Sequence, residues 1–283
     1  MATIELEPKA IGAPGIEPRW TRSAKEAVGT AYSTSSRVWF TVSGGVLSEI
    51  YYPTIDRPQV RDLQYLITDG KTFFHDIRRH LNSTVEYVTG CGLDIRVVNE
   101  DPDGRYRLIN HVIGDPHQAC VLIQTQLEGD QDFLSSLRLY VLLAPHLEVG
   151  GWGNTGNVTR IAGHSFLSEH KGDTWMALAA DIPILRTSCG YVGTSDGWQE
   201  IARAFKVEHE FAAADDGNIA LSAELDLRHR DRFTLGLPFG NSLHWAVTTL
   251  FQSLGIPFGE HSVRMREQRE RAAAGLRPLT RTS

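Results

Sequence analysis

SSRVWFTVSGGVLSEIYYP, residues 35–53, decides the fold class of this chain. Two hydrophobic runs with strand-like alternation flank a Ser-Gly-Gly corner, which is typical of β-sheet. Successive residues of a strand point to opposite faces, so Val38, Phe40 and Val42 share one face and Trp39 lies on the other. We therefore expect Phe40 to be buried in the core of a sheet structure.

The same alternation recurs along the chain, with turn signals between the runs. Residues 99–104 are rich in turn formers, and their Asp-Gly pair suits a tight hairpin. Crossover helices long enough for a parallel sheet are missing until late in the sequence. The pattern predicts an all-β fold, a large antiparallel sandwich or barrel. The expected strands are 38–42, 46–52, 63–68, 84–88, 93–99, 106–113, 120–127, 137–143, 158–166, 174–180, 219–227 and 233–237.

Helices are expected at a few places only. Residues 195–200 resemble a short capped helical turn, with Ser195 or Asp196 as the N-cap. Residues 242–254 place their apolar side chains on one stripe, which predicts a helix that ends at the following Gly and Pro. These short helices stand near the end of a chain that is otherwise made of strands.

The last helix, residues 260–274, is heavily charged and has a thin apolar side. Val263 and Met265 are its only large apolar residues, too few to bury it against the sandwich. We therefore expect its order to depend on something outside residues 1–255, since a helix of this length is marginal alone in water. The predicted organisation is an N-terminal arm at 1–18, a β domain at 19–258 and a helical linker or tail at 259–283.

The composition excludes two classes of partner. Lys and Arg number 28 against 34 Asp and Glu, a net charge of −6, and there is no long basic run. This argues against nucleic acid or an anionic membrane as the main partner. No apolar stretch approaches 18 residues, so we expect no transmembrane helix.

The N-terminus and the cysteines indicate a cytoplasmic protein. The first 20 residues show no basic segment followed by an apolar one, so no signal peptide is expected. Cys91, Cys120 and Cys189 are odd in number and lack metal-ligand spacing. We expect free, mostly buried thiols in a reducing compartment.

Candidate catalytic groups are weak at the level of sequence. The acidic pairs Asp101/Asp103 and Asp215/Asp216 stand in turn-like contexts, where Asp and Gly build turns. The eleven histidines are scattered without ligand spacing, so neither a metal nor a cofactor is expected. Residues 150–157, GGWGNTGN, lack the Lys-Ser/Thr of a phosphate loop and indicate a long loop with Trp152 at its tip.

Aromatic residues crowd the first quarter of the chain. Aromatic faces stack on the apolar faces of sugar rings and also anchor interfaces between proteins. Strand core is the simpler interpretation for alternate members, but neighbours such as Trp39 and Phe40 cannot share one face. The candidates for carbohydrate binding or domain docking are Trp20, Arg37, Trp39, Tyr51, Tyr52 and Trp152.

Three segments carry a resemblance to a known family. Residues 13–70, APGIEPRWTRSAKEAVGTAYSTSSRVWFTVSGGVLSEIYYPTIDRPQVRDLQYLITDG, closely resemble the opening of bacterial glucoamylases and glucodextranases, glycoside hydrolase family 15. The similarity continues through DGRYR at 103–107 and GYVGTSDGW at 190–198, and it weakens after about Gly255.

The resemblance implies a fold and a partner. In that family the segment is an N-terminal antiparallel β-supersandwich, similar to galactose mutarotase, which precedes an (α/α)6-barrel catalytic domain. The family's acid and base are glutamates of the barrel, and no position here matches them, so no catalytic residue is assigned. Residues 35–53 would then shape the side that faces the barrel, with Arg37 and Trp39 as docking residues.

Three functions stay open at this point. The first is a non-catalytic supersandwich domain of a glucoamylase-like enzyme, with the barrel, α-glucan or a second copy of the chain as partner. The second is a stand-alone carbohydrate-binding protein that uses exposed aromatics, tested by loss of glucan retention in Trp39→Ala or Trp152→Ala. The third is a mutarotase-like enzyme, which needs a His base and a Glu acid in one concave face. Fold alone does not choose between them.

Overall fold

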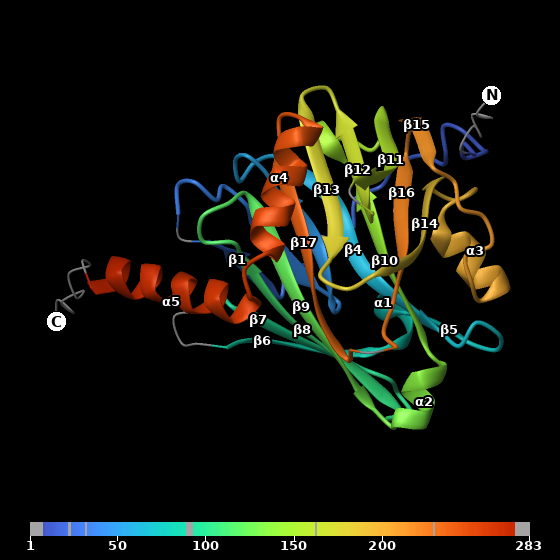
Figure 1. The fold of residues 1–283 in the computed structure, drawn as a ribbon, viewed down its shortest axis with the longest axis horizontal. Helices are drawn as coiled ribbons and strands as arrows, with labels where there is room; N and C mark the ends of the chain where they lie inside the picture. Colours follow the sequence, from blue (N-terminus) through green and yellow to red (C-terminus); the bar gives the residue numbers. More distant parts are fainter. Residues whose placement is uncertain are drawn as a thin grey trace.

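Two antiparallel sheets pack face to face and form a large sandwich, with helices on its outer surfaces (Figure 1). The computed structural model describes residues 8–21, 24–31, 33–88, 93–161, 163–228 and 230–274. All strand pairs of the two sheets in these ranges are antiparallel. The predicted all-β sandwich is confirmed.

The first sheet has eight strands in the order β1-β2-β3-β4-β10-β16-β14, and β5 pairs with β4 outside this path. Its outer side carries helix α3 (Gly197–Ala204) and is crossed by the N-terminal segment 8–21. The strands are β1 (Ala27–Thr30), β2 (Trp39–Ser43), β3 (Val46–Tyr51), β4 (Pro58–Thr68), β5 (Phe74–Asp76), β10 (Arg138–Pro145), β14 (Ile184–Tyr191) and β16 (Ile219–Leu225).

The second sheet has nine strands in the order β15-β11-β12-β13-β17-β9-β8-β7-β6. Helix α4 (Leu243–Leu254) covers the outer side of β13 and β17 (Figure 1). The strands are β6 (Asn82–Tyr87), β7 (Ile95–Glu100), β8 (Tyr106–Gly114), β9 (Cys120–Gly129), β11 (Asn154–Ile161), β12 (His164–Lys171), β13 (Thr174–Ala180), β15 (Ala213–Gly217) and β17 (Arg232–Gly240).

The last two strands in the chain are central in space. β16 lies between β10 and β14 in the first sheet. β17 lies between β9 and β13 in the second sheet and joins two runs of consecutive neighbours, β6 to β9 and β11 to β13. Each sheet is therefore completed by a strand that comes late in the sequence.

The core between the sheets confirms the register expected for residues 38–42. Val38, Phe40 and Val42 are fully buried in the main apolar cluster, and Trp39 faces the other way, beside its cross-strand partner Tyr51. Phe40 also explains a glycine of β1. A Cβ at Gly29 would lie 2.2 Å from the Phe40 ring, so the two strands can approach here only without a side chain.

Most expected strands are present, with one error and four omissions. The single strand expected at 158–166 is wrong, because β11 and β12 form a hairpin whose turn falls inside that range. The alternation simply continues from one strand into the next across a tight turn. The strands that the sequence reasoning missed are β1, β5, β14 and β15.

Short helices and turns connect the strands. Asp196 caps α3 as expected, by accepting a hydrogen bond from the Gln199 N–H, while the Ser195 hydroxyl accepts one from the Tyr191 N–H. Ser242 caps α4 in the same way. The remaining short helices are α1 (Ile77–His80), α2 (Gln131–Ser136) and the 3-10 helix η1 (Leu147–Val149).

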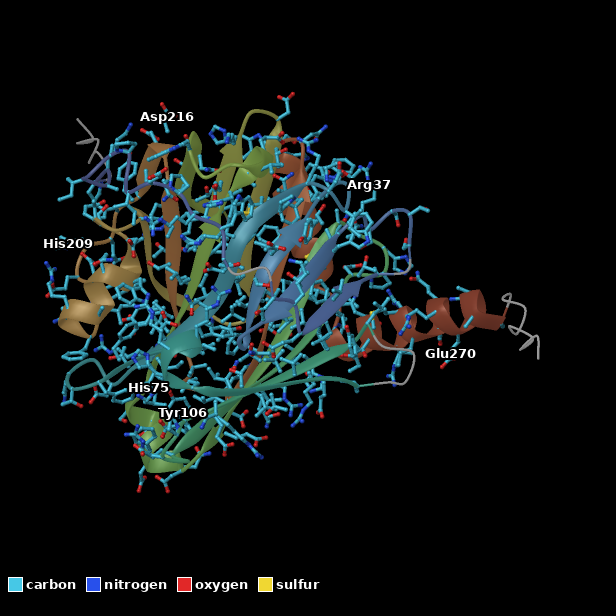
Figure 2. All side chains as sticks on the ribbon, turned by 180° about the vertical axis from the view of Figure 1, so that it is seen from behind. Arg37, His75, Tyr106, His209, Asp216 and Glu270 are labelled. Atoms are coloured by element: carbon cyan, nitrogen blue, oxygen red, sulfur yellow. The ribbon has the colours of Figure 1, made fainter. Side chains whose placement is uncertain are left out.

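Helix α5 (Phe258–Ala274) corrects an expectation about the tail. Its first half packs on the outer side of β8 and β9, where Phe258 and Met265 join an apolar cluster with Leu122. The predicted lack of packing is wrong because the helix begins two residues earlier than expected and so includes Phe258. Its second half, with Glu270, extends away from the sandwich (Figures 1 and 2).

Two predictions about individual residue types can be checked. Cys120 and Cys189 are buried and free, as expected, and Cys91 lies outside the described residues. The Asp-Gly turn between β7 and β8 is present, with a hydrogen bond from the Gly104 N–H to the Asp101 carbonyl at 2.8 Å. No helix in the described ranges is long and apolar enough to cross a membrane.

Candidate functional site

The outer face of β4 carries polar side chains that are buried. Polar side chains on the outer face of a sheet are ordinarily exposed to solvent. Leu63 and Tyr65 point into the core, so Asp62 and Gln64 point to the opposite side. Asp62 is only 3% exposed and Gln64 only 7%. Since burial of polar groups is unfavourable without partners, this pair marks an unusual place on the sheet.

A cavity of about 670 Å³ lies over these side chains. It is open to solvent on one side and is lined by parts of the N-terminal segment 8–21, β4, α1 and the start of α3. A volume of this size is within the range of small-molecule sites. Its walls include Trp20, Arg61, Asp62, Gln64, Arg79 and Trp198.

The carboxylates of the cavity have different tasks. Asp76 caps α1 and also accepts a hydrogen bond from the Trp198 indole at 2.8 Å. Asp196 caps α3, and burial raises the pKa of its carboxyl. Asp62 accepts a 2.8 Å hydrogen bond from Arg61 on one oxygen, while its other oxygen, Oδ1, has no partner within the described ranges. Among these three carboxylates, Asp62 is therefore the one with an oxygen that lacks a partner in the described ranges.

One wall of the cavity combines an aromatic ring with positive charge. The Arg79 guanidinium lies 4.6 Å from the centre of the Trp198 ring, in cation–π contact. Phe74 packs edge-on against the same ring, with centroids 5.7 Å apart. These contacts hold Trp198 in a fixed orientation at the cavity wall.

Behind Trp20 lies a buried histidine. His146 is 1% exposed, and neither ring nitrogen has a hydrogen-bond partner among the described residues. The Trp20 and His146 rings meet edge to face at 4.6 Å. Burial lowers the pKa of His146 to about 4, and the neighbouring Arg61 and Lys171 charges act in the same direction. His146 is therefore neutral at physiological pH.

A second buried ionisable group, Glu169, lies on β12. Both of its carboxylate oxygens lack hydrogen-bond partners in the described part of the chain. Burial raises its pKa well above the usual value, and the nearby Lys171 opposes this shift. The amine of Lys171 itself donates a 3.2 Å hydrogen bond to the Gly150 carbonyl. Glu169 is enclosed by the sandwich and has no access to the cavity lining.

One of the predicted site residues, Trp20, lines the cavity and is 39% exposed. The long loop expected at 150–157 is wrong, because β11 begins at Asn154. Trp152 is 45% exposed, as expected, and is not among the residues that line the cavity. Its neighbour Gly151 packs so tightly on the segment 8–21 that a Cβ there would lie 2.4 Å from Pro18 and 2.6 Å from His146.

The other four candidates form two separate groups. Trp39 and Tyr51 are cross-strand partners on β2 and β3, and Tyr51 donates a hydrogen bond to Glu49. Arg37 lies over the Tyr52 ring at 5.9 Å. In Figure 2, Arg37 lies at the rim of the sandwich, far from the end of α3. The six candidates therefore do not make one site.

Sequence reasoning missed the residues at the centre of the cavity. The strand expected at 63–68 in fact begins at Pro58, so Asp62 stood outside it. The only signal was a polar residue at alternate positions, Asp62 and Gln64, within an apolar strand. The described ranges contain no cluster of three or more His, Cys, Asp or Glu that could hold an ion.

Comparison with known proteins places this architecture in a family. The family described as glucodextranase, domain N, matches residues 10–271. A glucoamylase of Clostridium sp. (strain G0005) is 32% identical over 245 residues. That alignment covers 87% of this chain and 35% of the relative.

Solved structures agree. A bacterial glucoamylase crystallised with acarbose superposes with a TM-score of 0.90 and 29% identity, over 95% of this chain and 40% of that one. A glycosyl hydrolase of family GH92 superposes with a TM-score of 0.55 at 11% identity, over 87% of this chain and 34% of the other, which shows a shared fold alone.

These matches confirm the resemblance expected from residues 13–70. The chain spans only 35% of the length of the curated glucoamylase and 40% of the crystallised one, both of which contain further domains. Within those enzymes it corresponds to the N-terminal region. The chain belongs to the glucodextranase domain N family.

Proposed function

We propose that this chain is the non-catalytic sandwich domain of a glucoamylase-type glycoside hydrolase, and that it packs against an (α/α)6-barrel domain that hydrolyses α-glucan. The observation that carries the proposal is the uneven coverage of the alignments. They include 87–95% of this chain but only 35–40% of the glucoamylases. A domain that matches only part of two longer glucoamylases is best understood as one part of a larger enzyme.

The chemistry of the cavity supports a non-catalytic role. Hydrolysis of a glycosidic bond needs two carboxylates that act on the same bond. Asp76 and Asp196 are engaged as helix caps, which leaves Asp62 as the one cavity carboxylate with an unpartnered oxygen in the described structure. The described lining also holds neither a histidine nor a glutamate, so the mutarotase-like alternative lacks its base and its acid there.

The docking surface that we propose is the rim formed by β2 and β3. Arg37 is exposed and has a positive φ of 44°, a conformation that costs energy for a residue other than glycine. Trp39 lies on the outer face of β2, next to Tyr51. An exposed arginine beside partly buried aromatics is a composition typical of interfaces between protein domains.

Association with a separately produced barrel domain of a glucoamylase tests the proposal. We expect the chain to bind the barrel in sedimentation velocity and to raise its thermal midpoint. Arg37→Ala and Trp39→Ala should weaken the complex, while Trp245→Ala, a change of a 59% exposed side chain on α4, should not. The chain alone should release no glucose from maltose, starch or dextran. A turnover rate that disappears when one carboxylate of this chain is replaced would contradict the proposal.

A further inference from the structure

The cavity over β4 contains two acceptors without donors. Asp62 Oδ1 and Gln64 Oε1 are both buried and both lack a hydrogen-bond partner in the described ranges. A carboxylate oxygen accepts hydrogen bonds only, so the partner that suits Asp62 Oδ1 is a hydrogen-bond donor. Leaving such a group unpaired is costly, which makes a ligand with O–H or N–H groups favourable here.

The charges around the cavity select against ions. The lining carries four guanidinium groups, those of Arg19, Arg61, Arg78 and Arg79, against the three carboxylates of Asp62, Asp76 and Asp196. These guanidinium groups disfavour a cation. The carboxylates of Asp76 and Asp196 disfavour an anion. The mixture favours a neutral ligand that carries several hydroxyl groups.

The walls suit a ring with apolar faces. Trp20 lines the cavity on one side and is partly exposed, while Trp198 is held on the other side by Arg79 and Asp76. Indole rings stack on the C–H faces of sugars and leave the hydroxyl groups free for polar partners. The volume of about 670 Å³ is sufficient for a small saccharide.

We infer that this cavity is a saccharide-binding site, in which Asp62 and Gln64 accept hydrogen bonds from sugar hydroxyls and Trp20 packs against the ring. The choice of glucose units rests on the proposed function, since the domain would then work beside an α-glucan hydrolase. The site itself is separate from the docking residues Arg37 and Trp39, since Trp39 lies on β2, Arg37 precedes that strand, and neither lines the cavity.

Calorimetric titration of the purified chain with maltose and isomaltose tests this inference. We expect saturable binding, weakened about tenfold in Asp62→Asn because a hydrogen bond to a charged group is lost. Gln64→Met keeps the size of the side chain but removes the acceptor, so it should also weaken binding. It replaces Asp62→Asn as the test if that variant does not fold. Trp20→Ala should weaken binding too. Trp245→Ala is the control, because Trp245 is an exposed tryptophan on α4 and lies outside the cavity lining.

Two results would overturn the inference. One is the absence of heat or spectral change with either sugar up to about 50 mM, where even a millimolar site is nearly full. The other is that Asp62→Asn weakens association with the barrel domain and leaves sugar binding unchanged, which would make the cavity a docking surface. The first result leaves the proposed function standing, because association with the barrel is measured separately.

Discussion

Ser253, in the last turn of α4, donates a 2.7 Å hydrogen bond to Asp115, in the turn between β8 and β9. The two residues are 138 positions apart, and both are buried. His261 of α5 donates from Nε2 to the Ser253 carbonyl at 2.9 Å, because a carbonyl oxygen can only accept. These hydrogen bonds hold the connection between α4 and α5 against the second sheet, so the start of α5 is part of the domain.

The first prediction concerns the packing of α5. Met265→Ala should lower the free energy of unfolding by about 2–5 kcal/mol, the usual cost of a truncated buried side chain. Val263→Ala on the same helix is the control, since Val263 is 45% exposed and should change stability by less than about 0.5 kcal/mol. Urea unfolding followed by tryptophan fluorescence measures both. Equal effects would mean that α5 does not pack on the sheet in solution.

The second prediction concerns the register of β2. Phe40→Ala should cost about 3–5 kcal/mol because the ring is fully buried between the sheets. Trp245→Ala removes a larger but mostly exposed ring and should cost much less. Chemical denaturation of the two variants gives the comparison. A cost below about 1 kcal/mol for Phe40→Ala would reverse the register.

The third prediction concerns acid stability. The pKa of His146 falls from 6.5 to about 4 on folding, so the unfolded chain binds the proton more tightly. Stability is then fully present above pH 6.5 and is lost as the pH falls toward 4, by about 3 kcal/mol at most. His146→Gln should flatten this part of the curve of unfolding free energy against pH. If His146→Gln and the wild type show the same slope between pH 4 and 6.5, the His146 ring is charged in the folded protein over that range.

The fourth prediction has the opposite sign. The pKa of Glu169 is raised on folding, so the folded chain keeps its proton to higher pH than the unfolded chain does. Stability is fully present below pH 4.5 and is lost as the pH rises toward the folded pKa, by about 1.4 kcal/mol per pH unit. Glu169→Gln should remove this loss.

Glu260→Gln provides the control for that measurement, because the Glu260 side chain is 56% exposed on α5. This variant should still show the loss of stability that Glu169 causes. The contradicting outcome is a free energy of unfolding that rises from pH 4.5 to neutrality in the wild type and follows the same curve in Glu169→Gln. It would rule out a protonated Glu169.

The sequence predicted the features that depend on the alternation of side chains along a strand, which repeats every two residues. Along residues 38–42 the alternation of side chains locates both the strand and its buried face, and the structure agrees. It could not separate β11 from β12, because alternation carries no mark of a chain reversal. The helix of the tail was misjudged for a related reason, since the count of apolar residues began after Phe258.

The candidate site was largely invisible in the sequence. Asp62 and Gln64 stand inside a strand, where alternate polar residues ordinarily indicate a solvated face. Only the fold shows that α3 and the segment 8–21 cover this face and turn it into a cavity. Trp20 was found because it belongs to the aromatic residues that crowd the first quarter of the chain. Its partners His146 and Asp62 are distant in sequence and needed the structure.

The central position of β16 and β17 has a consequence for biosynthesis. The ribosome makes a chain from its N-terminal towards its C-terminal side, so both sheets stay interrupted until residues 219–240 have been translated. Until then β10 and β9 each expose an edge with unpaired N–H and C=O groups, the kind of edge that recruits foreign strands. Chaperones that shield such edges should therefore associate with nascent chains of this protein and leave once β17 is inserted. Messages truncated before and after codon 240 would give nascent chains with very different resistance to protease.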